Sequence, residues 1–170
     1  MYNIIIMTYN IIAAIDSNFG IGIDNTIPWK IKEDLLHFKN ITTRKNKSIV
    51  VMGKNTWLSL PNNCRPLKNR INMIITSDNK LYNNTFNNLD NCLKHIKENY
   101  HDHEIWIIGG EQLYKEAIIN NKCSLIYLTH ICKSSKLFKC NKFFPNIPTN
   151  FIQKEYNKVK TSNYELEYIV

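Results

Sequence analysis

The sequence predicts an α/β protein: a single domain with a central, mainly parallel sheet, a C-terminal antiparallel hairpin and helices on both faces. Three observations predict this fold. Strand-like and helix-like segments alternate through most of the 170 residues. The middle strands are continuous apolar runs, which is typical of parallel strands that are buried on both faces. The tail, Phe151–Val170, has the pattern of a hairpin, which would add antiparallel strands at one edge.

The first 60 residues supply two strands and two helices. Ile11–Asp16 is an apolar run suited to a central strand, and Ser17–Pro28 is a loop that contains two glycines. Lys30–Asn40 is predicted to be a helix because its apolar residues recur at helical spacing. Ser48–Gly53 is a β-branched strand that ends at a glycine, and Lys54–Leu60 follows it as a short helix.

The rest of the chain continues the alternation. It begins with the loop Pro61–Arg70. The predicted strands are Asn72–Ser77, Ile105–Ile108 and Leu125–His130, and the predicted helices are Leu89–Asn99 and Glu111–Asn120. All segments are assigned to one domain, residues 1–170, in which residues 1–8 are a candidate N-terminal extension. Residues 134–150 match no pattern and are assigned no function.

Composition restricts the class of function. The formal net charge is +8, but the lysines are scattered rather than grouped in an arm. We therefore expect a solvated face, or steering of a polyanionic small ligand, rather than binding of nucleic acid. No apolar run is long enough to cross a membrane. The five cysteines form no C-x-x-C pair and no zinc-type spacing, which predicts free thiols in a cytoplasmic protein and no metal site.

Asp34 occupies a position where a carboxylate is costly. In the first predicted helix it falls within the apolar stripe of Ile31, Leu35 and Phe38, whereas Glu33 points to the other side. A buried carboxylate must be paired, hydrogen-bonded or protonated, and burial raises its pKa toward the range useful for proton transfer. The alternative is a helix-start residue that is tied to nearby backbone.

Three strand ends carry segments that suit either phosphate binding or simple turns. Gly53-Lys54-Asn55-Thr56 places a glycine, a positive charge and a hydroxyl at a helix start, where backbone N–H groups favour anions. Gly109-Gly110 permits unusual backbone angles before the next helix, although the G-x-G-x-x-G fingerprint is absent. Thr76-Ser77 offers two hydroxyls, which are also common in turns.

The loop before the first helix completes the set. Gly20 and Gly22 can let this loop move over a site, and Pro28 suits the start of a helix. Trp29 is expected close to Asp34, where it either fills the core or holds a water molecule beside the carboxylate.

Taken together, these segments resemble the dihydrofolate reductase family. The matching segments are Ile12-Ala13-Ala14, Gly20–Trp29, Asp34 with Phe38, Met52–Trp57, Arg65-Pro66-Leu67, Arg70, Ile108–Tyr114 and Tyr127-Leu128-Thr129-His130. They run in the family's order and cover nearly the whole chain. The resemblance implies NADPH-dependent reduction of 7,8-dihydrofolate to 5,6,7,8-tetrahydrofolate by a monomeric enzyme that also binds antifolates.

The resemblance also implies the catalytic and substrate-binding roles. Asp34 would hydrogen-bond the pterin and promote protonation at N5 through a water that Trp29 helps to hold. Thr129 would brace the carboxylate, and Tyr114 would lie near the nicotinamide and C6. Arg70 would pair with the glutamate α-carboxylate. The pocket for the pterin and aminobenzoyl rings would be formed by Ile12, Leu35, Phe38, Leu60, Leu67 and Ile108.

For NADPH, the resemblance implies a nicotinamide pocket and a phosphate cradle. Ala14 and Ile21 would contact the carboxamide through backbone groups, and Lys54 with Ser77 would favour the 2′-phosphate. The other cofactor positions are Gly22, Gly53, Asn55, Thr56, Thr76, Gly109, Gly110, Glu111, Gln112 and Leu113. Many relatives place an arginine near this phosphate, and its absence here predicts weaker discrimination against NADH.

Three other functions are alternatives. A pyrimidine reductase of riboflavin synthesis would share the fold and NADPH, but Ile27-Pro28-Trp29 followed by Asp34, Phe38 and Arg70 argues against it. A nucleic-acid-binding module would use the +8 charge, yet the chain lacks aromatic residues interleaved with basic ones. A folate-binding protein without catalysis is disfavoured because Asp34, Trp29 and Thr129 are all present.

Overall fold

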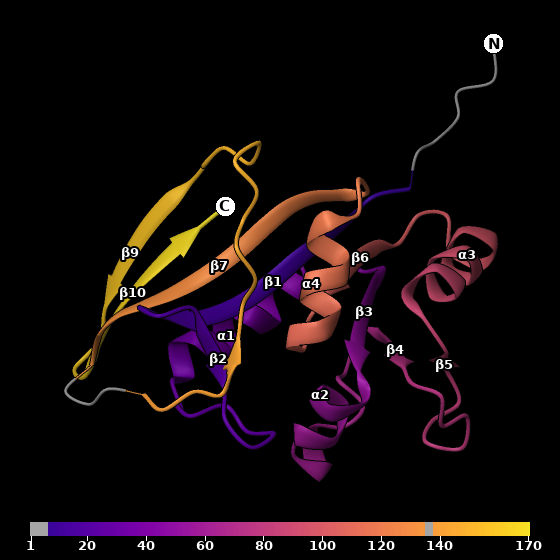
Figure 1. Cartoon of the computed structure of the whole chain (residues 1–170), viewed down its shortest axis with the longest axis horizontal. Helices are drawn as coiled ribbons and strands as arrows, with labels where there is room; N and C mark the ends of the chain where they lie inside the picture. The colour runs from indigo at the N-terminus through magenta and orange to yellow at the C-terminus, as the bar shows by residue number, and fades with distance from the viewer. Residues whose placement is uncertain (1–6, 135–137) are drawn as a thin grey trace.

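The computed structural model describes residues 7–134 and 138–170, and in this part of the chain an eight-stranded sheet carries helices on both faces (Figure 1). Most of the expected extension at residues 1–8 therefore lies outside the described residues. The strands are β1 (Tyr9–Asp16), β2 (Gly20–Gly22), β3 (Ser48–Gly53), β4 (Ile71–Ile75), β5 (Thr85–Phe86), β6 (Glu104–Ile107), β7 (Cys123–Ser134), β8 (Lys142–Phe143), β9 (Tyr156–Lys160) and β10 (Tyr164–Ile169). The helices are α1 (Lys32–Thr42), α2 (Lys54–Ser59), α3 (Leu89–Asn99) and α4 (Glu111–Ile119), with a 3₁₀ turn at Asn62–Cys64.

The strand order in the sheet is β5-β4-β3-β6-β1-β7-β10-β9. Neighbouring strands from β5 to β7 are parallel, whereas β10 is antiparallel to both β7 and β9. The hairpin of β9 and β10 extends the sheet at the edge opposite β5 (Figure 1). This arrangement confirms the predicted α/β fold with a C-terminal antiparallel hairpin.

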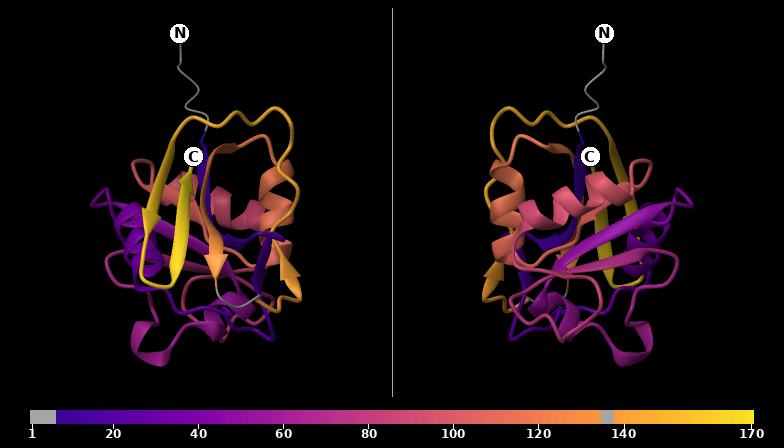
Figure 2. Two further views of the ribbon diagram at one scale, coloured as in Figure 1. Left: turned by 90° about the vertical axis from the view of Figure 1, so that its left-hand side faces the viewer. Right: turned by 90° about the vertical axis from the view of Figure 1, so that its right-hand side faces the viewer.

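Each face of the sheet has its own apolar core. On one face, Ile11 and Val51 pack with residues of α3 and α4. On the other face, Ile12 and Val50 pack with Trp57 of α2 and with Phe38 of α1. Figure 2 shows α1 and α4 on opposite sides of the sheet. Successive side chains of a strand point to opposite faces, so covering both faces requires the continuous apolar runs seen in the sequence.

The predicted elements are present, with small differences at their ends. β3 and α3 have the predicted bounds, and α1 is shifted by two residues. The structure adds β2, β5 and β8, which the sequence analysis did not predict because strands of two or three residues show no periodicity. β2 pairs with β8 in a separate two-stranded sheet. β8 falls within residues 134–150, so part of that unassigned region fastens the loop before α1.

The carboxyl ends of the central parallel strands lie at one edge of the sheet. Gly53 ends β3, Thr76 follows β4, and Gly109 lies two residues after β6. This edge is where ligands bind in open parallel sheets. Of the helices in residues 7–134 and 138–170, none is long and apolar enough to cross a membrane.

Candidate active site

The carboxyl group of Asp34 is buried in the first turn of α1. Ile31 precedes the helix with an extended backbone (φ −114°, ψ 112°) and accepts a hydrogen bond from the N–H of Leu35. Asp34 is 8% exposed, and burial raises its pKa from 3.8 to about 6. A carboxyl group with this pKa can bind and release a proton near neutral pH.

Thr129 and Trp29 lie against this carboxyl group. The polar hydrogens of both side chains lower the pKa of Asp34 and so offset part of the effect of burial. Both residues are buried, Thr129 on β7 and Trp29 in the loop before α1. Trp29 Nε1 has no hydrogen-bond acceptor of ordinary geometry among the described residues. Because buried donors are normally satisfied, this N–H suits a water or a ligand atom beside Asp34.

Tyr114 of α4 reaches the same region from the other side of the sheet edge. Its hydroxyl donates a 2.7 Å hydrogen bond to the carbonyl oxygen of Ile12. Burial, together with the negative charge of Asp34, holds the pKa of Tyr114 far above its usual value. A side chain at Gly109 would lie 2.9 Å from the Tyr114 ring, and Gly109 has φ +104°. Glycine at this position therefore lets the tyrosine ring pack directly on the backbone.

One apolar cluster contains five of the six apolar residues predicted to hold the substrate. Ile12, Leu67 and Ile108 are buried in it, and Phe38 and Leu60 are partly buried against it. These residues come from β1, α1 and the segments that follow α2 and β6. The fold therefore brings together residues that are far apart in the sequence, on the side of the sheet that carries α1.

The predicted burial of Leu35 is wrong, since this side chain is 59% exposed. The helix begins at Lys32, so Ile31 is not part of its stripe. Asp34, Phe38 and Thr42, at intervals of four, face the sheet together with Ile41, and Leu35 lies about 100° around the helix from Asp34. Leu35 does not belong to the core, and its contact with a ligand stays a prediction.

Arg70 lies beside Phe38, with its guanidinium carbon 5.6 Å from the ring centroid. Its Nε donates to the carbonyl oxygen of Lys68 at 3.0 Å, and its Nη1 donates to Thr42 Oγ1 at 2.8 Å. Burial lowers the pKa of Arg70. No carboxylate within the described residues forms an ion pair with it. Arg70 is thus a positioned cation that keeps Nη2 available for an anion.

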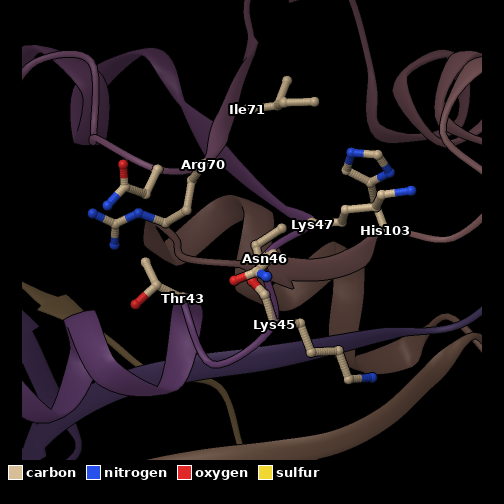
Figure 3. A pocket seen from close by; sticks show the side chains of 9 residues that line it. Thr43, Lys45, Asn46, Lys47, Arg70, Ile71 and His103 are labelled. Carbon is tan, nitrogen blue, oxygen red and sulfur yellow. The ribbon is translucent and has the colours of Figure 1, made fainter.

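A hollow of about 670 Å³ borders Arg70 and was not predicted from the sequence (Figure 3). It is lined by Thr43, Lys45, Asn46, Lys47, Ser48, Asn69, Arg70, Ile71 and His103. These residues come from three separate segments, so no local motif could reveal it. Lys45 lies 3.6 Å from Glu104, and Lys47 pairs with Asp102. These two acidic residues therefore balance part of the positive charge of the lysines that line the hollow.

The two glycine-containing turns predicted for phosphate binding lie next to each other. The N–H of Gly53 donates a 2.7 Å hydrogen bond to the carbonyl oxygen of Gly109. A Cβ at Gly110 would lie 3.3 Å from Thr56 Oγ1, so glycine keeps the approach between these turns open. Neither α2 nor α4 has a side-chain cap at its N-terminus. Backbone N–H groups at the start of α4 are therefore available to an anion.

The remaining phosphate-site residues differ in exposure. Asn55, Ser77 and Gln112 are exposed, whereas Leu113 is buried in the core and can offer only its backbone N–H. Glu111 is engaged by Lys115 at 3.2 Å and by Lys142 at 3.7 Å.

Lys54 is paired with an acidic residue that the sequence analysis did not consider. Its Nζ lies 3.3 Å from Asp78 Oδ2, and both side chains are 43% exposed. Thr76 Oγ1 accepts a hydrogen bond from the N–H of Asp78 at 3.0 Å, which fixes the turn after β4. A carboxylate therefore lies beside the lysine that was expected, together with Ser77, to favour the 2′-phosphate.

The loop before α1 is fastened at both ends of β2. Asp16 Oδ1 accepts hydrogen bonds from the N–H groups of Asn18 and Gly20 at 2.9 and 2.7 Å. A side chain at Gly20 would collide with Cys140, since its Cβ would lie 2.5 Å from Sγ. Ile21 is partly buried against the core. Together with Gly22 in β2 and Ala14 near the end of β1, it places backbone groups near the sheet edge described above.

Comparison with known proteins gives consistent matches along the chain. The family model described as dihydrofolate reductase matches residues 8–170. The dihydrofolate reductase of Heliothis virescens is 35% identical over 149 residues, covering 81% of this chain and 79% of that protein. That of Drosophila melanogaster is 34% identical over 154 residues, covering 85% and 83%. The solved structure of Schistosoma mansoni dihydrofolate reductase aligns with a TM-score of 0.81 at 29% identity, covering 96% of both chains.

Proposed function

This chain belongs to the dihydrofolate reductase family and reduces 7,8-dihydrofolate to 5,6,7,8-tetrahydrofolate, and we propose that NADPH is its hydride donor and Asp34 its proton-transfer group. The observation that carries the proposal for Asp34 is its burial between Thr129 and Trp29 with a pKa of about 6. The riboflavin-pathway and nucleic-acid alternatives are not favoured, because the relatives described above are dihydrofolate reductases.

Asp34 hydrogen-bonds the pterin and promotes protonation at N5. Its raised pKa keeps a useful fraction of the carboxyl group protonated near neutral pH, which a solvent-exposed aspartate would not do. Thr129 holds the carboxyl group in position. Trp29 Nε1 is the donor that holds a water between Asp34 and the substrate. It has no acceptor of ordinary geometry in the described part of the chain.

The rest of the substrate extends along the apolar cluster toward Arg70. Ile12, Phe38, Leu67 and their neighbours in that cluster contact the pterin and aminobenzoyl rings. Arg70 binds the α-carboxylate of the glutamate. Two of the five N–H groups of a guanidinium are committed to Lys68 and Thr42, which fixes the plane of the group. The remaining donors are then preorganised for a carboxylate.

The residues at the sheet edge fit NADPH. The uncapped start of α4 and the close approach allowed by Gly110 suit the pyrophosphate, and Lys54 supplies charge for the 2′-phosphate. When bound, NADPH supplies the hydride that reaches C6. This chain supplies position and electrostatics, and Tyr114 packs near the reacting carbons. Comparison of kcat/KM for NADPH and NADH tests the preference, which equal values would reject.

The setting of the enzyme is also a proposal. Cys64, Cys92, Cys123, Cys132 and Cys140 are free thiols, which supports a reducing, cytoplasmic compartment. We expect a monomer that binds dihydrofolate and antifolates and does not bind nucleic acid or membranes. Sedimentation analysis of the purified protein would test the monomeric state.

The first experiment follows the loss of NADPH absorbance on mixing the protein with dihydrofolate, with and without methotrexate. Loss that methotrexate blocks supports the reductase activity and its pterin pocket. Absence of turnover despite tight methotrexate binding would instead indicate a folate-binding protein.

The role of Asp34 needs its own variant. Asp34→Asn is expected to lower kcat at pH 7 by about 10²–10⁴-fold, because a positioned proton-transfer group is removed. The loss should shrink at lower pH, where solvent can protonate the substrate. Glu33→Gln is the matched control, since Glu33 is exposed on the same helical turn. A near-wild-type rate for Asp34→Asn at pH 7 would remove Asp34 from the mechanism.

A further inference from the structure

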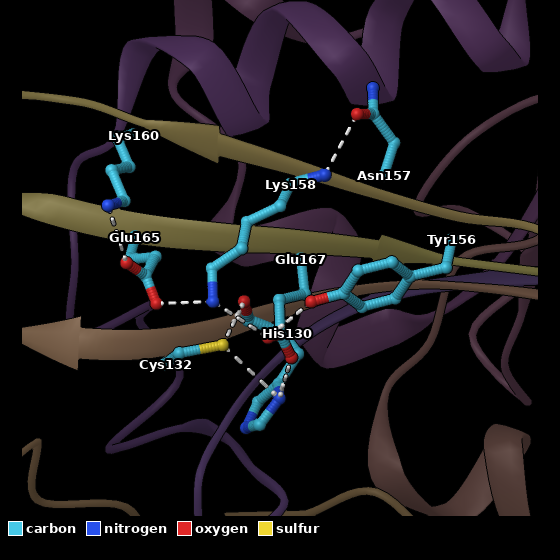
Figure 4. Close-up of polar contacts among 8 residues, drawn as sticks. All are labelled: His130, Cys132, Tyr156, Asn157, Lys158, Lys160, Glu165 and Glu167. Atoms are coloured by element: carbon cyan, nitrogen blue, oxygen red, sulfur yellow. Dashed lines mark hydrogen bonds and ion pairs between the residues drawn. The ribbon is translucent and has the colours of Figure 1, made fainter.

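Three side chains that are strong metal ligands meet on β7 and β10, near the C-terminal edge hairpin of the sheet (Figure 4). His130 and Cys132 are two residues apart on β7, and Glu167 lies opposite His130 in the antiparallel pairing of β7 with β10. All three are partly buried, and one ligand atom from each lies within 4.8 Å of the other two. This cluster lies outside the residues assigned to the substrate and the cofactor.

The local strand geometry explains why these atoms meet. Alternate residues of a strand point to the same face, so His130 and Cys132 share a face that Thr129 does not. Ile131 pairs with Leu166 and Lys133 pairs with Glu165, so the register shifts by one residue and Cys132 has no partner on β10. Such a bulge bends the strand locally and redirects side chains.

Two of the three distances between ligand atoms are close to those of tetrahedral zinc coordination, and the third is within 4.8 Å. His130 Nδ1 lies 3.2 Å from Glu167 Oε2, and Cys132 Sγ lies 3.5 Å from His130 Nδ1. Ideal zinc bonds at tetrahedral angles would place nitrogen and oxygen about 3.4 Å apart, and sulfur and nitrogen about 3.6 Å apart. An ion could therefore enter between the three side chains with only small movements.

The polar neighbours of Glu167 occupy one of its carboxylate oxygens and leave the other, Oε2, facing the cluster. Tyr156 and Lys158 both contact Glu167 Oε1, at 2.7 and 3.4 Å, while Oε2 faces His130. With Oε1 held by these two donors, Oε2 is the oxygen of Glu167 that is directed at the cluster. Lys158 opposes a cation, but its Nζ is nearer to Glu165, at 2.6 Å.

We propose that His130, Cys132 and Glu167 bind one zinc-class divalent cation, with a water molecule as the fourth ligand. The residue types combine imidazole, thiolate and carboxylate, which suits zinc or cobalt rather than calcium or magnesium. Binding replaces the proton of the Cys132 thiol with a metal–sulfur bond, so one proton is released and no electron is transferred. The ion links β7 to β10 and so stabilises the C-terminal hairpin.

The test uses the reduced, chelator-treated full-length protein titrated with Co²⁺. We expect one equivalent to bind and to give a thiolate-to-cobalt charge-transfer band in the near ultraviolet, which Zn²⁺ then abolishes. Zinc at saturation should raise the midpoint of thermal unfolding by about 5 °C or more. Affinity should increase with pH, because the metal competes with the thiol proton.

Three variants distinguish this site from adventitious binding. Cys132→Ser should lose the charge-transfer band, and His130→Gln should weaken cobalt binding more than tenfold while its circular dichroism spectrum stays that of the parent. Cys64→Ser, which removes an exposed thiol elsewhere, should change neither. The proposal is rejected if the unmodified protein shows no such band, or if the band survives in Cys132→Ser.

Discussion

Lys54 and Asp78 form an ion pair at the sheet edge proposed for the cofactor, with 3.3 Å between Nζ and Oδ2. The lysine is the residue expected to favour a 2′-phosphate, and the aspartate places a negative charge beside the same group. An anion that binds here must compete with Asp78 for Lys54. The pair thus gives a physical reason, beyond the absence of an arginine, for the weak discrimination between NADPH and NADH that we predict.

Asp78→Asn is therefore expected to raise kcat/KM for NADPH by about 1.4- to fivefold and to leave the value for NADH unchanged. The magnitude follows from the ~0.2–1 kcal/mol typical of exposed ion pairs. Asparagine keeps the acceptor Oδ1 that the N–H of Lys80 uses, so the turn should persist. Asp90→Asn, which removes one exposed charge on α3, is the control. An equal gain for both cofactors would show that Asp78 does not act on the phosphate.

Burial of Asp34 should cost stability at neutral pH. Its folded-state pKa of about 6 lies above the value of 3.8 in the unfolded chain, so the folded state binds more protons between these values. The free energy of unfolding therefore increases as pH falls from 7 toward 4. The shift corresponds to an upper bound of ~3 kcal/mol at pH 7.

Asp34→Asn is accordingly expected to raise the free energy of unfolding by about 1–3 kcal/mol at pH 7, with a smaller gain at pH 4. Urea unfolding at both pH values measures the difference. Glu33→Gln should change stability by less than about 0.5 kcal/mol. A variant that is less stable than the parent at pH 7 would mean that the carboxylate is better paired than its surroundings indicate.

The sequence predicted the long elements of this fold because their signals are local. β3 is a continuous β-branched run that ends at Gly53, and α3 begins after Asn88, whose side chain accepts a hydrogen bond from the N–H of Asn91. The short strands β2 and β8 depend on pairing with each other, from opposite ends of the chain. No local pattern specifies such a pair.

The same distinction applies to the site residues. Asp34 could be identified because a carboxylate interrupts an apolar stripe, and the structure buries it. Leu35 was misplaced because the stripe was counted from Ile31, which lies before the helix. Lys54 pairs with Asp78 between the ends of two different strands. His130 pairs with Glu167 between two neighbouring strands. Spacing motifs could not reveal these pairs, since they read only neighbouring positions.

Arg70→Lys should separate charge from geometry in substrate binding. Lysine keeps the positive charge but loses the planar fork that binds a carboxylate through two bonds. We expect KM for dihydrofolate to rise at least about tenfold, with little change in kcat. A dihydropterin that lacks the glutamate should show no such change. Arg65→Lys is the control, because the Arg65 guanidinium is committed to Trp57 and Asn62.

Tyr114 and Tyr9 offer a matched test of whether a buried hydroxyl serves catalysis or only the fold. Each donates a hydrogen bond to a backbone carbonyl, Tyr114 to Ile12 at 2.7 Å and Tyr9 to Ala117 at 2.9 Å. Replacing either by phenylalanine leaves a buried acceptor unsatisfied, which should lower the free energy of unfolding by about 1–3 kcal/mol. The two variants should therefore be similarly destabilised.

Their activities should differ. Tyr114 holds the middle of β1, where the pterin and nicotinamide are proposed to meet, whereas Tyr9 is the first residue of that strand. Tyr114→Phe is expected to lower kcat by about tenfold, since small displacements of reacting groups are costly, and Tyr9→Phe should retain the parent rate below its unfolding transition. Urea unfolding and steady-state kinetics on both proteins decide the matter. Equal kcat values for the two variants would assign Tyr114 a purely structural role.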